Sequence, residues 1–157
     1  IQYRRGLLPE PEREFYISGD AFAKDWIKKV RNDVPDAPVL VTAGGLLHYF
    51  EENKVISLLR MIGQSGNMEV VFDTVNKKGM AMMQKKYMKQ VGHADAQMFF
   101  YVDAAKELAA KIRGNVKVIA EEPYYRYIPK NGLKLSTKVS MAVSDQFKMV
   151  KMIHLKL

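Results

Sequence analysis

The chain contains no cysteine. This absence excludes a disulfide framework, a cysteine nucleophile and any metal site built on thiolates. Long hydrophobic runs are also missing, because none approaches the ~18–20 apolar residues that a membrane-spanning helix needs. No signal peptide opens the chain. The sequence therefore predicts a cytoplasmic protein that has no membrane partner.

Acidic residues are scarce in the second half of the chain. Residues 1–76 carry 9 basic and 11 acidic side chains, whereas residues 77–157 carry 16 basic and 6 acidic ones, for a net charge of +8. A basic half is compatible with nucleic-acid binding. However, the lysines after residue 76 alternate with Met80, Met83 and Tyr87, as on the solvated face of an amphipathic helix, and no RNA-binding motif accompanies them. We expect no nucleic-acid partner and keep a basic nucleic-acid binder as the weakest alternative.

Short apolar runs alternate with helical patterns along the whole chain. Strands are expected at residues 15–18, 39–43, 68–72, 116–120 and 149–157. Helices are expected at residues 25–32, after Glu51, at 77–91, after a capping Asp103, and at 133–147, where Leu135, Val139 and Val143 are spaced by four. This alternation predicts an α/β fold with a mostly parallel sheet. The run Val39–Ala43 is typical of a strand buried on both faces.

The expected strands end in residues suited to ligand binding. In parallel sheets, ligands bind beyond the carboxyl ends of the strands. Those ends fall at Gly19–Asp20–Ala21, at Ala43–Gly44–Gly45 and at Asp73. Glycine lets a ligand approach the backbone closely. The pattern predicts a nucleotide-type crevice without naming its ligand.

Several segments, in their order along the chain, resemble a known family. They are Tyr16–Phe22 (YISGDAF), Ala37–Phe50 (APVLVTAGGLLHYF), Val70–Asp73 (VVFD) and Gly92–Gln97 (GHADAQ), preceded by Arg4–Pro9 (RRGLLP). Together they are similar to the leucine carboxyl methyltransferase family, within it the tetracenomycin-type O-methyltransferases of polyketide synthesis. In that family Arg4–Pro9 matches the helix after the second strand. The resemblance covers essentially the whole chain.

The resemblance implies an S-adenosylmethionine-dependent methyltransferase with a Rossmann-like sheet in the order 3-2-1-4-5-7-6. On this template the five expected strands are strands 3, 4, 5 and 6 and the antiparallel strand 7. Strands 1 and 2, with the glycine-rich loop and the ribose-binding acidic residue, have no counterpart in the sequence. We therefore expect residues 1–157 to be the C-terminal part of a single methyltransferase catalytic domain, inactive by itself. A bare edge on strand 4 would then be covered by further chain or by a second copy.

The resemblance also assigns donor-binding residues. Asp20, Ala21 and Phe22 match positions that contact the adenine of S-adenosylmethionine. Ala43, Gly44 and Gly45 match positions along the donor's methionine and adenosine. Many members carry Glu at the position of Gly44, so this chain lacks a carboxylate that could hold the donor's ammonium group. From the residues alone, a turn or helix-capping aspartate at Asp20 and a simple tight turn at Gly44–Gly45 stay open.

Three further residues are candidates for substrate contact. They are His48 and Tyr49, at the start of a helix, and His93, in an expected loop. His48 has the chemistry of a general base near neutral pH, or it caps and packs the helix. His93 with Asp95 supplies too few ligands for a metal, so no metal site is expected. Asp73 is expected to cap a turn, and no residue is assigned a catalytic role.

The function that the resemblance implies is transfer of a methyl group from S-adenosylmethionine to a hydroxyl or carboxylate of a small, polyketide-like acceptor. A carboxylate acceptor needs little acid–base help, so such an enzyme works mainly by positioning and desolvation. The alternative is a non-catalytic α/β binding or dimerisation module that has lost its donor site. A homo-oligomer fits either hypothesis.

Overall fold

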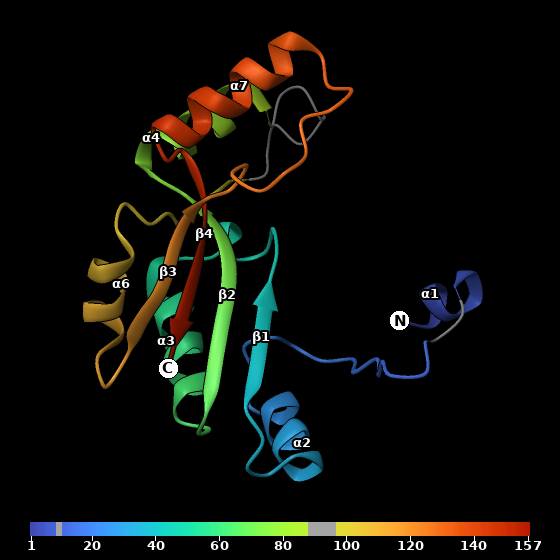
Figure 1. Cartoon of the computed structure of the whole chain (residues 1–157). Coiled ribbons are helices and arrows are strands. Elements are labelled where there is room, and N and C mark those ends of the chain that lie inside the picture. The colour runs from blue at the N-terminus through green and yellow to red at the C-terminus, as the bar shows by residue number, and fades with distance from the viewer. Residues whose placement is uncertain (9–10, 88–96) are drawn as a thin grey trace. The chain divides into compact units, whose positions relative to one another are not determined.

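The computed structural model describes residues 1–8, 11–87 and 97–157 (Figure 1). The helical elements are α1 (Gln2–Leu7), α2 (Asp25–Asp33), η1 (Leu47–Tyr49), α3 (Glu52–Gly63), α4 (Lys77–Met82), η2 (Met83–Tyr87), α6 (Ala105–Ile112) and α7 (Leu135–Gln146). The strands are β1 (Val39–Ala43), β2 (Met68–Val75), β3 (Lys117–Pro123) and β4 (Val150–Lys156).

The described chain divides into two compact units, Ile1–Ala37 and Pro38–Leu157. The first unit holds α1 and α2. Within it, the Arg31 guanidinium donates to the backbone carbonyl of Ala37 at 2.7 Å, and the Arg4 guanidinium lies 5.0 Å from the Tyr16 ring centre. The second unit contains the entire sheet.

The sheet has the order β1-β2-β4-β3. β1 and β2 are parallel, with Val41 beside Val70. β4 runs antiparallel to β2 on one side and to β3 on the other. This is the 4-5-7-6 portion of the expected order, with the last strand inserted and reversed. The prediction for this part of the sheet is confirmed.

One face of the sheet forms the core. Side chains alternate along a strand, so Val70 and Phe72 of β2 share a face with their register partners Leu155 and Ile153 of β4. All four are fully buried. The helices α3 and α6 contact each other and the strands β2 and β3, and their apolar stripes cover this face (Figure 1). Burial of these stripes fixes α3 and α6 against the sheet.

The other face of the sheet is partly open, which corrects the expectation that Val39–Ala43 is buried on both faces. Leu40 of β1 is 56% exposed, and Thr42 is exposed as well. Among the described residues, β1 is paired along one edge only, with β2. A near-continuous apolar run suits a doubly covered strand, but in this structure β1 is an edge strand with one uncovered face.

Residues 15–18 do not form a strand, contrary to expectation. They are extended without a ladder, and Phe15 is 88% exposed. A strand exists only through hydrogen bonds to a neighbouring strand. No described strand pairs with this segment, so its apolar run alone does not produce a strand.

Two details of the helices also differ from expectation. The basic helix is α4 followed by the π-helical turn η2, and its expected continuation to residue 91 lies outside the described residues. Asp103 does not cap the helix that follows it. Its Oδ1 instead accepts the backbone N–H of Lys77 at 2.9 Å, in the first turn of α4. The carboxylate therefore caps a helix that precedes it in sequence, because the chain returns to the end of β2.

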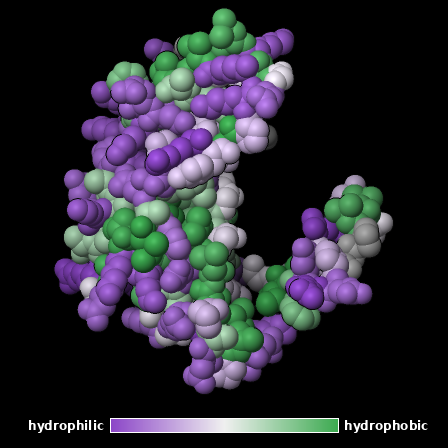
Figure 2. Space-filling view, in the orientation of Figure 1, coloured by the Kyte–Doolittle hydropathy of each residue, from purple (hydrophilic) through white to green (hydrophobic). Residues whose placement is uncertain are grey.

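The helix expected at residues 133–147 is present as α7, but its apolar spacing faces outward. Leu135 is 77% exposed, and Val139, Val143 and Phe147 are exposed too. Figure 2 shows hydrophobic surface at the end of the molecule where α7 lies. The inward side holds Met141 and Ser144. In the described part of the chain, no helix is both long and apolar enough to cross a membrane.

Candidate functional site

The loop after β1 is held by a carboxylate from the neighbouring strand. The Gly45 backbone N–H donates to Oδ1 of Asp73 at 2.7 Å. Gly45 has φ +63°, in the left-handed region that glycine adopts without strain. Ala43 ends β1, and Gly44 follows it at once. The loop expected to line the donor is therefore tied to β2 by one charged hydrogen bond.

The second carboxylate oxygen of Asp73 faces His48. His48 Nε2 lies 3.4 Å from Asp73 Oδ2, and both side chains are largely buried. Burial acts to raise the pKa of the Asp73 carboxyl. The bonds from His48 and from the Gly45 N–H outweigh burial, so the pKa lies below its usual value. Asp73 is thus an anion that organises both the glycine loop and the imidazole.

His48 is itself fixed through its backbone. Its carbonyl accepts the N–H groups of Phe99 at 2.7 Å and of Phe100 at 3.2 Å. His48 is 4% exposed, and its Nδ1 atom is buried without a hydrogen-bond partner among the described residues. Tyr49 is partly exposed, with its ring edge-on to the imidazole at 6.3 Å. The structure thus places His48 in the interior and Tyr49 at the surface.

The backbone at the end of β1 is open to a ligand. A Cβ atom built on Gly44 or Gly45 would meet no heavy atom within 4 Å beyond the adjacent residues. A ligand can therefore approach the main chain at these positions as closely as glycine allows. The loop fits a nucleoside-containing cofactor lying across the carboxyl end of β1.

The other expected donor residues lie in the first unit. The Asp20 carboxylate accepts the N–H of Phe22 at 2.9 Å, and the Ala21 carbonyl accepts the indole N–H of Trp26 at 2.9 Å. These bonds form a local turn before α2. The structure therefore brings Ala43, Gly44, Gly45 and His48 together around Asp73, while Asp20, Ala21 and Phe22 form a turn of their own. His93 and Asp95 lie outside the described residues.

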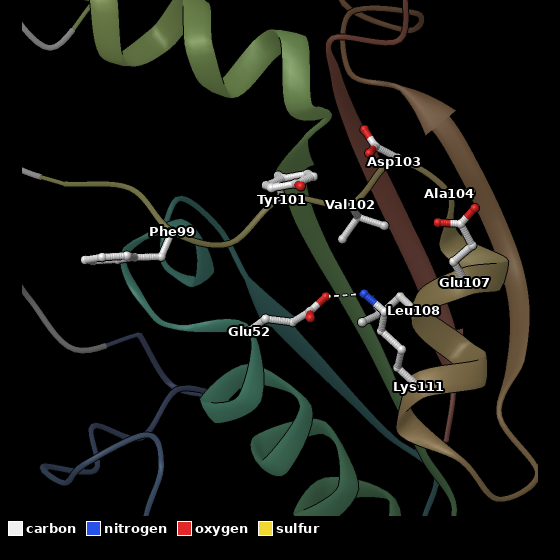
Figure 3. Close-up of a pocket in the computed structure, with 9 residues that line it drawn as sticks. All are labelled: Glu52, Phe99, Tyr101, Val102, Asp103, Ala104, Glu107, Leu108 and Lys111. Atoms are coloured by element: carbon white, nitrogen blue, oxygen red, sulfur yellow. Dashed lines mark hydrogen bonds and ion pairs between the residues drawn. The ribbon is translucent and has the colours of Figure 1, made fainter.

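A pocket of about 320 Å³ opens between α3, α6 and the segment that precedes α6 (Figure 3). Its lining includes Glu52 of α3, Glu107 and Lys111 of α6, and Tyr101 and Asp103 of the connecting segment. The Lys111 ammonium bonds the Glu52 carboxylate at 2.6 Å and spans the two helices. That bond raises the pKa of Lys111, so the amine stays charged. Sequence reasoning missed this pocket, because its residues come from three separated segments.

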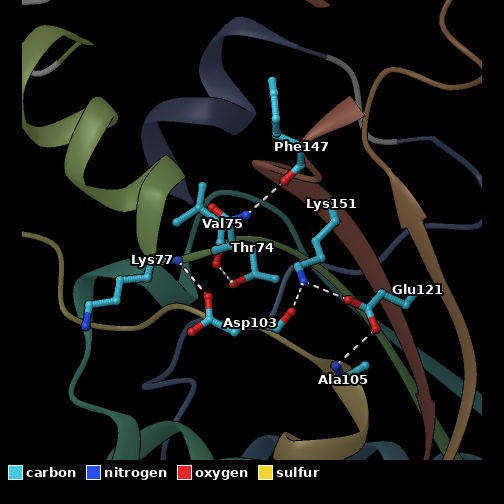
Figure 4. Close-up of polar contacts among 9 residues, drawn as sticks. Thr74, Val75, Lys77, Asp103, Ala105, Glu121, Phe147 and Lys151 are labelled. Carbon is cyan, nitrogen blue, oxygen red and sulfur yellow. Dashed lines mark hydrogen bonds and ion pairs between the residues drawn. The ribbon is translucent and has the colours of Figure 1, made fainter. Parts of the chain in front are cut away.

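A buried lysine is the second feature that the sequence did not reveal. Lys151 of β4 is 1% exposed, and its ammonium donates to Glu121 Oε1 of β3 and to the Asp103 carbonyl, each at 2.7 Å (Figure 4). The other Glu121 oxygen accepts the Ala105 N–H that begins α6. Burial acts to raise the pKa of Glu121, but Lys151 and the Ala105 N–H together hold it below its usual value. The pair joins β3, β4 and the start of α6.

Comparison with known proteins places this arrangement in context. No family model matches the chain. Over 127 residues, the chain is 32% identical to the S-adenosyl-L-methionine-dependent methyltransferase dpfgK of Gibberella zeae, a match that covers 73% of this chain and 41% of that protein. The chain thus spans well under half of this relative.

Two solved structures share the fold. A DUF574 family protein from Streptomyces avermitilis matches 99% of this chain and 60% of its own, with a TM-score of 0.63 at 11% identity. A SAM-dependent methyltransferase from Anabaena variabilis matches 94% of this chain and 60% of its own, with a TM-score of 0.51 at 10% identity. The mixed α/β sheet is therefore part of the Rossmann-like fold found in S-adenosylmethionine-dependent methyltransferases, as the sequence predicted.

Proposed function

We propose that this chain is the donor- and acceptor-binding portion of an S-adenosylmethionine-dependent O-methyltransferase acting on a small, polyketide-like molecule. The 32% identity to a methyltransferase over 73% of the chain carries the proposal. The sheet order, with a reversed strand between β2 and β3, supports it. Within this class, the motifs quoted above favour the leucine carboxyl methyltransferase family and its tetracenomycin-type branch. A cytoplasmic location accords with this assignment.

The chain's own residues supply the floor of the donor site. Gly44 and Gly45 offer main chain unobstructed by side chains, and Asp73 holds the loop in one conformation. When bound, S-adenosylmethionine supplies a sulfonium methyl group, to which an acceptor oxygen bonds as the C–S bond breaks, leaving S-adenosylhomocysteine and, from a hydroxyl, a proton for solvent. A preorganised loop lowers the entropic cost of aligning these groups. Asp20, Ala21 and Phe22 are proposed as adenine contacts, because they match adenine-contacting positions in the family that the sequence resembles.

We assign His48 a positioning role. Its Nε2 faces Asp73, and its Nδ1 is buried away from solvent. A general base must reach the proton that it removes. His48 instead links the glycine loop to Phe99 through its carbonyl, and so fixes the distance between this loop and the pocket. Tyr49, at the surface, and His93 are proposed as acceptor contacts.

A matched pair of glycine variants tests the donor site. Gly45 and Gly66 both have positive φ and open space around a built Cβ, but Gly66 lies between α3 and β2, at the other end of the sheet. Each change to alanine strains the backbone by about 1 kcal/mol. In calorimetric titration with S-adenosylhomocysteine, we expect Gly45→Ala to weaken binding roughly tenfold or more, because a Cβ intrudes where the ligand lies.

The Gly66→Ala protein should bind S-adenosylhomocysteine as the parent chain does. Equal weakening by both substitutions would show that strain, and not contact, is responsible. Absence of saturable binding by a folded protein that also carries the expected glycine-rich loop upstream of Ile1 would contradict the proposal itself.

A binding or dimerisation module is the second candidate function. The single-sided pairing of β1 within the described residues, together with the exposed Leu40, favours it. An edge strand of this kind can pair with another strand. Sedimentation of the chain as a concentration-dependent dimer, combined with no response to S-adenosylhomocysteine in a protein restored upstream of Ile1, would support this alternative over the methyltransferase.

A further inference from the structure

The pocket between α3 and α6 has a charge opposite to that of the whole chain. Glu52, Asp103 and Glu107 line it against one cation, Lys111, while the chain carries +8. Lys111 is already bonded to Glu52. Within the described residues, no cation forms an ion pair with Glu107, although its charge acts on Lys111 and contributes to the raised pKa of that lysine, and the Asp103 carboxylate accepts a backbone N–H. The cavity is therefore acidic in an otherwise basic molecule.

An aromatic ring completes the lining. Tyr101 is 36% exposed, and Figure 3 shows its ring near the Glu52–Lys111 pair. An aromatic face and a carboxylate attract the same kind of ligand, an organic cation, the ring through its negative face and the carboxylate through its charge. A volume of about 320 Å³ accommodates a small molecule.

The pocket adjoins the loop that we propose as the donor site. Phe99, which lines the pocket, donates its N–H to the His48 carbonyl, and His48 contacts the same Asp73 that holds Gly45. Glu52 begins α3 three residues after η1 ends. A molecule in the pocket therefore lies beside the carboxyl ends of β1 and β2, where an acceptor must be presented.

We infer that the acceptor carries an ammonium group, which Glu107, Asp103 and the Tyr101 ring hold in this pocket. The inference rests on the proposed function and narrows its substrate class to amine-bearing alcohols or phenols, with carboxylates disfavoured. The protonated amine has no lone pair and only anchors the molecule. The hydroxyl oxygen forms the new C–O bond as the C–S bond of the donor breaks, and its proton passes to solvent.

Three probes that share a phenol ring and differ in charge test the pocket. Tyramine carries an ammonium group, tyrosol a neutral hydroxyl and 4-hydroxyphenylacetate a carboxylate. We measure their binding to the chain by ligand-observed NMR titration without any donor. Tyramine should bind most tightly and 4-hydroxyphenylacetate most weakly, with about a tenfold difference between them. Equal affinities, or a preference for the carboxylate, would overturn the inference.

Four substitutions at three residues locate the binding site of tyramine. Glu107→Gln is nearly isosteric. It should weaken the binding of tyramine roughly three- to tenfold and leave the affinity for tyrosol unchanged. Glu69→Gln removes the same charge from the open face of the sheet, where Glu69 pairs with His154, and should leave tyramine binding unaltered. Tyr101→Phe keeps the aromatic ring and should retain the affinity for tyramine, whereas Tyr101→Leu removes the ring and should lose this affinity. Unchanged tyramine affinity in both Glu107→Gln and Tyr101→Leu would exclude this pocket.

The experiment separates this inference from the methyltransferase proposal. Tyramine preference with the expected variant effects, but no binding of S-adenosylhomocysteine by the protein that also carries the upstream glycine-rich loop, leaves the cation pocket in place and rejects the donor site. Binding of S-adenosylhomocysteine without a preference for tyramine supports the donor site and rejects the cation pocket. A thermal melt of each variant confirms that it is folded, so that a loss of affinity reports the pocket.

Discussion

Asp73 is the residue on which the proposed donor site depends. One carboxylate oxygen holds the Gly45 N–H at 2.7 Å, and the other faces His48 at 3.4 Å. The sequence predicted a cap for the next turn, and the structure shows Asp73 capping a loop on the neighbouring strand. Its pKa lies below the usual value, because these bonds outweigh burial. The ionised form therefore stabilises the fold.

The sign of this pKa shift gives a pH prediction for Asp73→Asn. A lowered pKa in the folded chain contributes stability above the usual aspartate pKa of about 4, and this contribution is lost as the pH falls through the lowered value. Asp73→Asn should lower the free energy of unfolding by about 1 kcal/mol at pH 7. The difference in the free energy of unfolding between Asp73→Asn and the parent should shrink below about pH 4.

Urea unfolding at pH 7 and at pH 3 measures this effect. Asp36→Asn changes an exposed carboxyl and serves as the control, with little expected change at either pH. A deficit for Asp73→Asn that is the same at both pH values would show that the charge of Asp73 is not what stabilises the loop.

At the scale of elements, a buried ion pair joins two strands and a helix. Lys151 on β4 meets Glu121 on β3, and Glu121 also accepts the N–H that starts α6 (Figure 4). Removing one member of a buried pair leaves the other charge uncompensated, which costs more than the intact pair contributes. The arrangement therefore fixes β3 and α6 relative to β4, at the edge of the pocket that contains Asp103 and Glu107.

Lys151→Met is predicted to destabilise the chain by about 3 kcal/mol at neutral pH, because the Glu121 carboxylate then lacks its cation. The double variant Lys151→Met with Glu121→Gln should recover part of this loss. Chemical unfolding of the parent, both single variants and the double variant yields the coupling energy. Strictly additive losses would show that the two side chains do not act as a pair.

The sequence predicted local elements better than their surroundings. The runs at Val39–Ala43 and Met68–Phe72 identified β1 and β2, because β-branched and apolar side chains fit a pleated, half-buried surface. The apolar run at residues 15–18 did not form a strand, because pairing depends on a distant neighbour. The spacing of Leu135, Val139 and Val143 identified α7 but not which side faces outward. Periodicity reports an apolar stripe and not what covers it.

The candidate site was predictable only in part. The Ala43–Gly45 loop follows from the end of a strand and two glycines, a pattern that the sequence shows directly. The involvement of Lys151 and Glu121 was not predictable, since they lie 30 positions apart and meet only through the reversed strand β4. Tyr101, Glu52 and Glu107 converge through packing of α3 on α6. Contacts of this kind depend on the tertiary fold and cannot be predicted from the spacing of residues along the sequence.

At the scale of the whole molecule, the central claim is that S-adenosylmethionine binds across the carboxyl end of β1. The second unit also has a cavity of about 370 Å³ at the other end of the sheet, lined by Leu59, Gly63, Gly114 and Leu157 among others. A nucleoside ligand would change the amide chemical shifts of different residues at each of the two locations. A mapping experiment therefore decides between them without depending on activity.

The most direct measurement is an amide chemical-shift titration of the isotope-labelled chain with S-adenosylhomocysteine, with adenosine monophosphate as the control ligand. The account predicts saturable shifts at Gly44, Gly45 and His48 that exceed those at Gly63 and Gly114, and smaller effects from the control ligand. Shifts confined to Gly63 and Gly114 would contradict it.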